Sequence, residues 1–278
     1  MIFMTLKELL SKNLTKKELA LVPSSFDIIG NKEKAVAIIV IPEKLKRKKI
    51  IANALMKKHK NVKTVLIKKS ARKGIFRVYD FDVIGEKNTE VMHVESGCRF
   101  LLDPQRVYFS PREGSERLRI AAQIKENENI MIFFAGVGPY AIIIAKKAKP
   151  ANIVGIEINP DAVEYFKKNI KLNKLSNIEA ILADVKDIDE GFYDKFDRVI
   201  MPLPESAIDY ITQALLCLKK NGICNLYCFA KEDEIKKIKA KIKNIAKKQK
   251  RRIKFINIIK VKQWGPSIWK YRIDFVVR

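Results

Sequence analysis

The chain has 278 residues, of which 47% are hydrophobic, and it carries a formal net charge of +25. The hydrophobic content excludes a disordered protein, and the length suits a domain of about 150 residues plus a smaller one. No apolar run approaches the ~20 residues of a membrane span, and the N-terminus lacks a signal-peptide layout. We therefore expect a cytoplasmic protein with no membrane partner. The charge favours a nucleic-acid partner over a merely lysine-rich or heat-adapted surface.

The first 105 residues are predicted to form an N-terminal helix within residues 1–22 and a small α+β RNA-binding domain over residues 23–105. Leucines near helical spacing place the first helix at 5–17. Apolar runs separated by turn residues predict strands, and a lysine-rich segment between them predicts a basic helix. The expected strands are 25–30, 36–41, 62–67, 76–84, 91–94 and 98–102, and the basic helix is 44–58.

Residues 106–278 alternate between strand and helix patterns, which is typical of a parallel sheet with helices on both faces. A linking helix is expected at 117–125. The expected strands are 130–132, 152–156, 178–182, 196–201 and 223–229, and the helices are 140–147, 161–172, 206–219 and 233–247. Two closing strands, 253–261 and 271–277, lack an intervening helix and indicate an antiparallel edge. The predicted fold class is therefore α/β, a Rossmann-like domain with a seven-stranded sheet.

The most informative segment is the glycine turn Phe133-Phe134-Ala135-Gly136-Val137-Gly138-Pro139, which lies between a predicted strand and a predicted helix. Glu157 follows Gly138 by nineteen residues, at the end of the next strand. Such glycines let the backbone approach a nucleoside-containing ligand, and such a carboxylate accepts hydrogen bonds from ribose hydroxyls. The turn lacks the third glycine of dinucleotide enzymes, so S-adenosylmethionine fits better than NAD. Plain connection chemistry is the alternative reading.

Two further strand ends carry candidate site residues. Asp184 is expected to face the adenine amine, or alternatively to cap a helix. The segment Met201-Pro202-Leu203-Pro204 is expected to form the wall beside the transferring methyl group and the target base, or alternatively a rigid strand exit. The four cysteines and two histidines match no zinc spacing, so we predict no metal site and buried free thiols.

Several motifs in fixed order resemble the archaeal and eukaryotic tRNA (guanine-37-N1) methyltransferase family over about residues 22–278. The motifs are Lys73-Gly74-Ile75-Phe76-Arg77, Phe109-Ser110-Pro111-Arg112, Glu116-Arg117, the glycine turn, Glu157-Ile158-Asn159-Pro160, Asn169-Ile170-Lys171-Leu172-Asn173-Lys174 and Trp264-Gly265-Pro266. The resemblance implies a class I methyltransferase fold, S-adenosylmethionine as cofactor, and the anticodon stem-loop of tRNA as partner of a monomeric enzyme.

The resemblance also implies roles for single residues. Glu116 matches a general base that removes the N1 proton of guanine, and Arg77 matches an arginine that holds guanine O6. From the sequence alone, Glu116 could form a helix-start ion pair with Arg117, and Arg77 could be a surface strand residue. The predicted catalytic residues are Glu116, Arg77 and Pro202, and the substrate-binding residues are Arg77, Tyr108, Arg112 and Pro204. The predicted cofactor contacts are Tyr108, Ala135, Gly136, Gly138, Pro139, Glu157, Ile158, Asp184, Val185, Met201 and Pro202.

Three departures from the family pattern modify these expectations. Ile132 stands where the family normally has aspartate, and this could weaken cofactor binding or shift it to Glu157 and Asp184. Pro202 stands where guanine-only members have asparagine, as in an archaeal branch that also acts on the tricyclic wyosine precursor. Only some 20 residues precede the matching region, too few for the family's elbow-binding domain. A basic run over 236–252 is then expected to supply much of the RNA affinity, or else to be a solvated helix face.

Four readings follow from these features. The first is N1 methylation of guanosine 37. The second is C7 methylation of the wyosine precursor at the same position, alone or in addition, which Pro202 favours. The third is transfer of the aminocarboxypropyl group of the same cofactor, which the residues at 110–112 and 201–204 argue against. The fourth is an RNA-binding protein with a decayed cofactor site, which only Ile132 supports.

Overall fold

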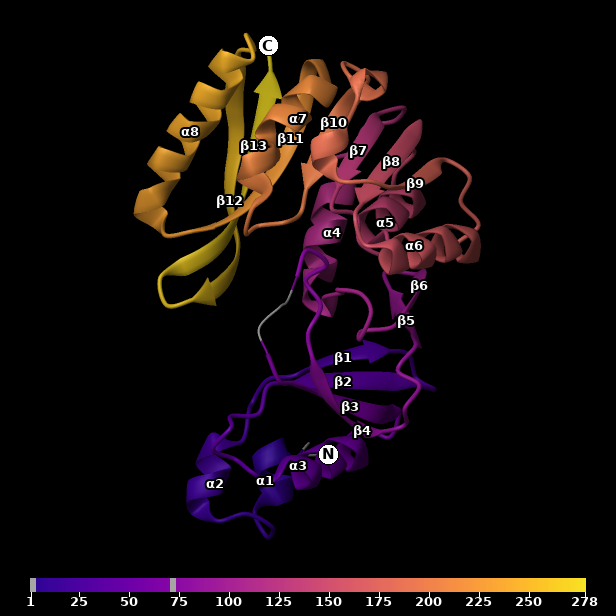
Figure 1. The fold of residues 1–278 in the computed structure, drawn as a ribbon, viewed down its shortest axis with the longest axis vertical. Helices are drawn as coiled ribbons and strands as arrows, with labels where there is room; N and C mark the ends of the chain where they lie inside the picture. Colours follow the sequence, from indigo (N-terminus) through magenta and orange to yellow (C-terminus); the bar gives the residue numbers. More distant parts are fainter. Residues whose placement is uncertain (1–3, 71–73) are drawn as a thin grey trace. The chain divides into compact units, whose positions relative to one another are not determined.

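The computed structural model describes residues 4–70 and 74–278, and its internal contacts divide the chain into two compact units, Met1–Gly114 and Ser115–Arg278. The predicted domain boundaries at residues 22 and 105 remain predictions. Each unit is described by itself (Figure 1). No helix in the described part of the chain is both long and apolar enough to cross a bilayer.

The first unit is built on a four-stranded sheet in the order β1-β2-β3-β4. Its strands are β1 (Asp27–Gly30), β2 (Ala35–Ile39), β3 (Val62–Lys68) and β4 (Phe81–Gly85). Helix α3 (Lys48–Lys58) connects the parallel strands β2 and β3 and buries Ile51 and Leu55. A separate hairpin, β5 (Val91–Glu95) and β6 (Cys98–Leu102), follows. The strands expected at 25–30 and 36–41, and at 91–94 and 98–102, form antiparallel pairs, and the expected basic helix is present but begins at Lys48.

Two predictions for the first unit are wrong in detail. The helix expected at 5–17 is two helices, α1 (Leu6–Leu10) and α2 (Lys16–Leu21), because Thr5 and Thr15 each begin one with a capping box. The strand expected to begin at residue 76 begins at Phe81, because residues 74–77 form a turn in which Arg77 has a φ of 58°. Lys73 lies outside the described residues.

The second unit holds the predicted seven-stranded sheet, in the order β12-β13-β11-β10-β7-β8-β9. Its strands are β7 (Asn129–Phe133), β8 (Asn152–Glu157), β9 (Ile178–Leu182), β10 (Phe196–Met201), β11 (Leu218–Ala230), β12 (Ile253–Gly265) and β13 (Ile268–Val277). Strands β7 to β11 run parallel, and β13 is antiparallel to both β11 and β12. The predicted antiparallel edge is therefore confirmed.

The helices of the second unit connect these strands in the expected order (Figure 1). They are α4 (Gly114–Ala121), α5 (Pro139–Lys147), α6 (Pro160–Leu172), α7 (Ile211–Cys217) and α8 (Ile235–Lys248), with short 3-10 turns η2 (Val185–Asp187), η3 (Glu190–Phe192), η4 (Ala207–Tyr210) and η5 (Glu232–Glu234). The helix expected at 206–219 ends early, because Leu218 already pairs with Phe196 at the start of β11.

The core of the second unit lies between the sheet and its helices, and it includes Phe133, Met201, Leu226, Ile242 and Phe275. The four cysteines are free and buried, as predicted. Burial raises the pKa of Cys217 and of Cys228 to about 12, so both thiols stay protonated at neutral pH. Protonated, buried thiols behave as small apolar side chains.

Candidate active site

The strand order places the candidate site at a switch in chain direction across the sheet. Strand β7 lies between β8 and β10 in the sheet. Strand β8 follows β7 in the chain through α5, whereas β10 is the third strand after β7. Ligands of open α/β sheets bind beyond the carboxyl ends of the strands at such a point. The glycine turn, Glu157, Asp184 and Met201 all follow or end strands at this edge.

Every second residue of the glycine turn from Phe134 to Gly138 has a positive φ angle. Phe134 has a φ of 55°, Gly136 of 56° and Gly138 of 84°. Gly138 caps α5, and Pro139 occupies its first turn, where a missing N–H costs nothing. A Cβ atom on Gly138 would lie 2.0 Å from Cδ2 of Phe166 on α6. Glycine is therefore required here both by the backbone angle and by the close approach of α6.

Glu157 braces the glycine turn from the end of β8. One of its carboxylate oxygens accepts a hydrogen bond from the Gly136 N–H at 2.8 Å, and the other accepts one from the Asn159 N–H at 2.9 Å. Burial raises the pKa of Glu157, and these backbone donors, together with that of Ile158, oppose the rise. A carboxylate has about four acceptor sites, so Glu157 keeps at least one that can accept from a hydroxyl.

Asp184 and the exit of β10 show local structural roles. The Asp184 side chain accepts a hydrogen bond from the Lys186 N–H at 3.0 Å and so caps η2, in which Val185 is buried. The carbonyl of Pro204 accepts a hydrogen bond from the Phe229 N–H at 3.0 Å, which ties the end of β10 to the end of β11. Met201 is fully buried, whereas Pro202 is half-buried beside it. Asp184 therefore caps η2, and Pro204 fixes the exit of β10. The ligand-binding roles predicted for this region remain proposals.

Glu116 is a buried carboxylate in the first turn of α4, with 3% of its surface exposed. Its Oε1 accepts hydrogen bonds from the Tyr227 hydroxyl and from Nη1 of Arg272, both at 2.7 Å. Its Oε2 accepts one from Nη1 of Arg119. The helix-start ion pair considered from the sequence was with Arg117, whereas the structure pairs Glu116 with Arg119 and Arg272. Through Tyr227 and Arg272, Glu116 also joins α4 to strands β11 and β13.

A chain of buried polar side chains continues from Glu116 across the sheet. Arg272 donates from Nε to both oxygens of Asp274, at 3.0 and 3.2 Å, and Asn225 donates to Asp274 at 2.7 Å. Arg198 then bonds Asn225 at 3.0 Å and pairs with Glu128 at 2.8 and 3.1 Å. Buried charges persist only when paired in this way.

The sequence analysis missed this polar chain. Its signal was present as charged or amide residues within otherwise apolar strands, such as Arg272 and Asp274 two positions apart in the last strand. Residues two apart in a strand share a face, so the pair marks a polar strip inside the core. Their partners lie far away in the sequence, and no local pattern identifies them.

The remaining predicted residues belong to the first unit. Arg77 lies in the turn before β4 and is half-buried, and Tyr108 is 44% exposed. Arg112 lies in the 3-10 turn η1 (Pro111–Glu113) and forms an ion pair with Asp27 of β1. Ile132, which replaces the aspartate usual in the family, is buried in β7 with 1% of its surface exposed. No group of three or more metal-ligating side chains occurs in residues 4–70 and 74–278.

Comparison with known proteins identifies relatives over most of the chain. Trm5b of Pyrococcus abyssi, named as a tRNA (guanine(37)-N(1))-methyltransferase, is 39% identical over 258 residues, covering 92% of this chain and 75% of the relative. Its crystal structure matches with a TM-score of 0.85 at 38% identity, covering 95% of this chain and 78% of that one.

One further relative is named for two reactions, and another was solved with a bound ligand. Taw22 of Nanoarchaeum equitans, a tRNA (guanine(37)-N(1))/4-demethylwyosine(37)-methyltransferase, is 35% identical over 303 aligned positions, covering 90% of this chain and 98% of the relative. TYW2 of Methanocaldococcus jannaschii, solved in complex with AdoMet, matches with a TM-score of 0.70 at 28% identity, covering 91% of this chain and 99% of that one.

Two family descriptions cover nearly the whole sequence. The TYW2 N-terminal domain matches residues 6–88, and the TRM5/TYW2 methyltransferase domain matches residues 91–254. The second match alone spans more than half of the chain, and it includes the glycine turn, Glu116 and Glu157. The resemblance predicted from the motifs is confirmed, and this chain belongs to the TRM5/TYW2 methyltransferase family.

Proposed function

We propose that this chain transfers a methyl group from S-adenosylmethionine to N1 of guanosine 37 in tRNA, next to the anticodon. The observation that carries the proposal is the glycine turn after β7, held open by positive φ angles and braced by Glu157 at the switch point of the sheet. The 39% identity to a named tRNA (guanine(37)-N(1))-methyltransferase supports the same reaction. The enzyme acts as a monomer in the cytoplasm on the anticodon stem-loop of its tRNA.

The residues at the carboxyl edge fit the cofactor. Gly136 and Gly138 present backbone without a side chain, and the remaining acceptor capacity of Glu157 suits a ribose hydroxyl. Asp184 uses one oxygen as a cap and has the other for the adenine amine. When bound, S-adenosylmethionine supplies an electrophilic methyl group on a sulfonium. The family resemblance assigns further cofactor contacts to Tyr108, Ala135, Pro139, Ile158, Val185, Met201 and Pro202.

The chemistry needs a base and a group that stabilises negative charge. As N1 of guanine forms its bond to the methyl carbon, the bond from that carbon to the sulfonium sulfur breaks and leaves a neutral thioether. The N1 proton must leave at the same time, and the carboxylate of Glu116 accepts it. Arg77 donates hydrogen bonds to guanine O6, where negative charge grows. The family resemblance also assigns Tyr108, Arg112 and Pro204 to binding of the base, which leaves the anticodon-loop stack as single-stranded recognition requires.

A second activity, C7 methylation of 4-demethylwyosine at position 37, is favoured by Pro202. This half-buried proline takes the place of an amide side chain that would orient guanine. Taw22 of Nanoarchaeum equitans, named for both activities, aligns over 98% of its length. Incubating the protein with tRNA carrying either G37 or 4-demethylwyosine, followed by mass spectrometry of nucleosides, tests this proposal. Product from both tRNAs supports two activities, and product from G37 alone contradicts the second.

Replacing Pro202 with asparagine is expected to shift this preference toward guanine. An amide adds donors and acceptors for the guanine edge and removes apolar surface beside the tricyclic base, so the ratio of kcat/KM values should change about tenfold. The measurement is kcat/KM for both tRNAs with wild type and Pro202→Asn. Pro204→Asn serves as the control at the other proline of the segment. An unchanged ratio in Pro202→Asn would remove Pro202 from the specificity argument.

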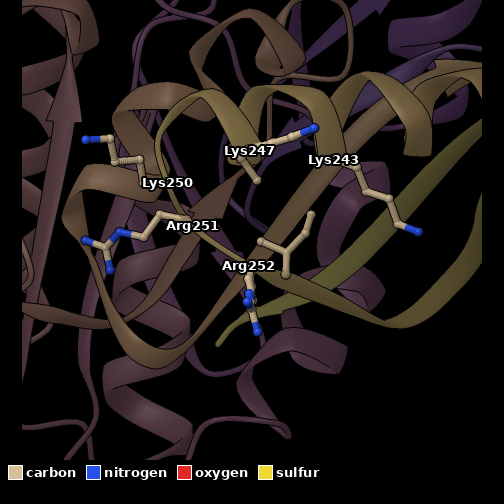
Figure 2. A pocket seen from close by; sticks show the side chains of 7 residues that line it. Lys243, Lys247, Lys250, Arg251 and Arg252 are labelled. Atoms are coloured by element: carbon tan, nitrogen blue, oxygen red, sulfur yellow. The ribbon is translucent and has the colours of Figure 1, made fainter.

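The basic surface of α8 is proposed to bind the phosphate backbone of the tRNA. Helix α8 starts after the carboxyl end of β11 and ends before β12, so its last turn lies at the sheet edge opposite the candidate cofactor site. There, a pocket of about 460 Å³ is lined by Lys243, Ala246, Lys247, Lys250, Arg251, Arg252 and Ile253. Figure 2 shows the cationic side chains arranged around it from the helix and from the segment that follows.

Acidic partners neutralise only part of this surface. Lys241 pairs with Asp209 at 3.2 Å, and Arg251 pairs with Asp194. The ammonium nitrogens of Lys239 and Lys243 lie 5.0 and 6.0 Å from the centre of the Phe255 ring, a cation–π contact that leaves their positive charge unneutralised. The further cations of the run are Lys236, Lys237, Lys247, Lys248, Lys250 and Arg252. A field of this kind attracts a polyanion.

Charge reversal at Lys247 and Lys250 is expected to weaken tRNA binding. It should also make the dissociation constant for tRNA less dependent on salt concentration. Each lysine that contacts phosphate contributes about one unit to the slope of log Kd against log salt, so Lys247→Glu with Lys250→Glu should lower the slope by about two. Cofactor affinity should stay unchanged. The control is Lys146→Glu with Lys147→Glu, an equal charge change in the last turn of α5. Equal losses in both double variants would indicate a net-charge effect and contradict a specific site on α8.

A further inference from the structure

The two carboxylate oxygens of Glu116 have partners of different kinds. Oε1 accepts from Tyr227 and Arg272, which are 0% and 1% exposed. Oε2 accepts from Arg119, whose side chain is 46% exposed. A buried donor cannot leave without breaking the core, whereas a half-exposed guanidinium can turn into solvent and remain hydrated. Oε1 of Glu116 therefore keeps its hydrogen-bond partners, whereas Oε2 can exchange Arg119 for another partner.

Arg272 is itself fixed by the polar chain behind it. Its Nε donates to both oxygens of Asp274, and Asp274 is held from the other side by Asn225 at 2.7 Å. The guanidinium is thus clamped between Asp274 and Glu116, with its plane set by at least three hydrogen bonds. A planar, always charged donor held in this way defines the position of Oε1 more narrowly than a flexible ammonium could.

Tyr227 is a permanent donor to the same oxygen. Burial raises its pKa well above 10, and neighbouring Tyr140 and Glu116 raise it further, so the phenol stays protonated at every working pH. Tyr140 lies two residues after Gly138 of the glycine turn, and its ring centre is 6.3 Å from that of Tyr227. The ring of Tyr227 therefore packs beside Tyr140 in the first turn of α5, the helix that follows the glycine turn.

We propose that Arg272 and Tyr227 are positioning residues for the base: they hold Oε1 of Glu116 so that Oε2 receives the substrate proton when Arg119 turns away. The inference rests on the proposed function. The two carboxylates Glu116 and Asp274 balance the two guanidinium groups Arg272 and Arg119 while Glu116 is ionised. After Oε2 has taken the N1 proton and Arg119 has moved to solvent, Asp274 and Arg272 still form a neutral pair. Neither state leaves an uncompensated buried charge.

The test compares single-turnover methylation rates of Tyr227→Phe, Arg272→Lys and Arg198→Lys at saturating tRNA and S-adenosylmethionine. Misplacing a reacting group by about 1 Å can cost about 100-fold. We expect the rate to fall about tenfold in Tyr227→Phe and about 100-fold in Arg272→Lys, with dissociation constants for tRNA and cofactor within about twofold of wild type. Arg198→Lys is the matched control, since Arg198 lies in the same polar chain, 2% exposed, but contacts Asn225 and Glu128.

The control separates positioning from stability. Both arginine variants are expected to lower the melting temperature, but Arg198→Lys should keep its rate within about twofold of wild type. Wild-type rates in Tyr227→Phe and Arg272→Lys, or an equal loss in Arg198→Lys, would overturn the inference. If Arg272→Lys does not fold, Tyr227→Phe still tests the inference, because this substitution removes only the hydroxyl that donates to Glu116. A wild type that methylates no tRNA would overturn the proposed function itself, together with this inference.

Discussion

Glu116→Gln is expected to slow methyl transfer to G37 at least 100-fold while the fold persists. General base catalysis contributes about 10²–10⁴-fold, and glutamine cannot accept the N1 proton. The amide oxygen can still accept from Tyr227 and Arg272, which now reach Oε1 at 2.7 Å. The measurement is the single-turnover rate together with the dissociation constants of both substrates. Glu116→Ala is a poorer test, because it leaves the Tyr227 hydroxyl and Nη1 of Arg272 without their acceptor beside a cavity, at a cost of about 1–3 kcal/mol for each buried donor.

Glu128→Gln provides the matched control for this prediction. Glu128 is also a buried carboxylate, paired with Arg198 at the far end of the same polar chain. Its replacement should lower the free energy of unfolding without changing the rate of methyl transfer by more than about threefold. If Glu116→Gln retains the wild-type rate, Glu116 is a structural ion-pair residue and the base must be sought elsewhere.

Gly138→Ala is expected to abolish measurable cofactor binding and to destabilise the protein by about 2–6 kcal/mol. A φ of 84° strains an alanine by about 1–3 kcal/mol, and the added Cβ would meet Phe166 at 2.0 Å, which adds an overpacking cost of about 1–3 kcal/mol. Relief by moving α5 away from α6 would also move the glycine turn. The measurements are urea denaturation and calorimetric titration with S-adenosylmethionine.

Gly97→Ala separates backbone strain from the clash. Gly97 has a similar φ of 80°, but a Cβ added there meets no atom within 4 Å. Its replacement should therefore cost only the strain, about 1–3 kcal/mol, and leave cofactor affinity unchanged. Wild-type cofactor affinity in Gly138→Ala would show that the turn does not approach the ligand as proposed.

Local patterns in the sequence were sufficient for most elements. The glycine turn, Asn159-Pro160 before α6 and the lysine stripe of α8 act through the nearest few residues, and the structure places each in the expected element. The errors arise where a pattern fits two conformations. Residues 76–80 alternate as a strand would, but Arg77 adopts a φ of 58° and the segment turns instead. Residues 218–222 resemble a helix end, but β11 already pairs with β10 there.

The candidate site was predictable only in part for a related reason. Glu116, Glu157 and Asp184 could be found from motifs and strand ends, because each lies beside a local signal. The residues that hold Glu116 could not, since Tyr227 is 111 positions away and Arg272 is 156 positions away. Such contacts depend on strand order and register, which set the neighbours of a buried side chain and which no short pattern in the chain determines.

Formation of 1-methylguanosine at position 37 is the most direct test of the account. Purified protein would be incubated with S-adenosylmethionine and an unmodified tRNA transcript carrying G37, with an otherwise identical transcript carrying A37 as the control. Nucleosides would then be identified by mass spectrometry. The account predicts 1-methylguanosine from the G37 transcript alone, lost in Glu116→Gln and Arg77→Ala. No methylated nucleoside from any tRNA, or 1-methylguanosine from the A37 transcript as well, would contradict it.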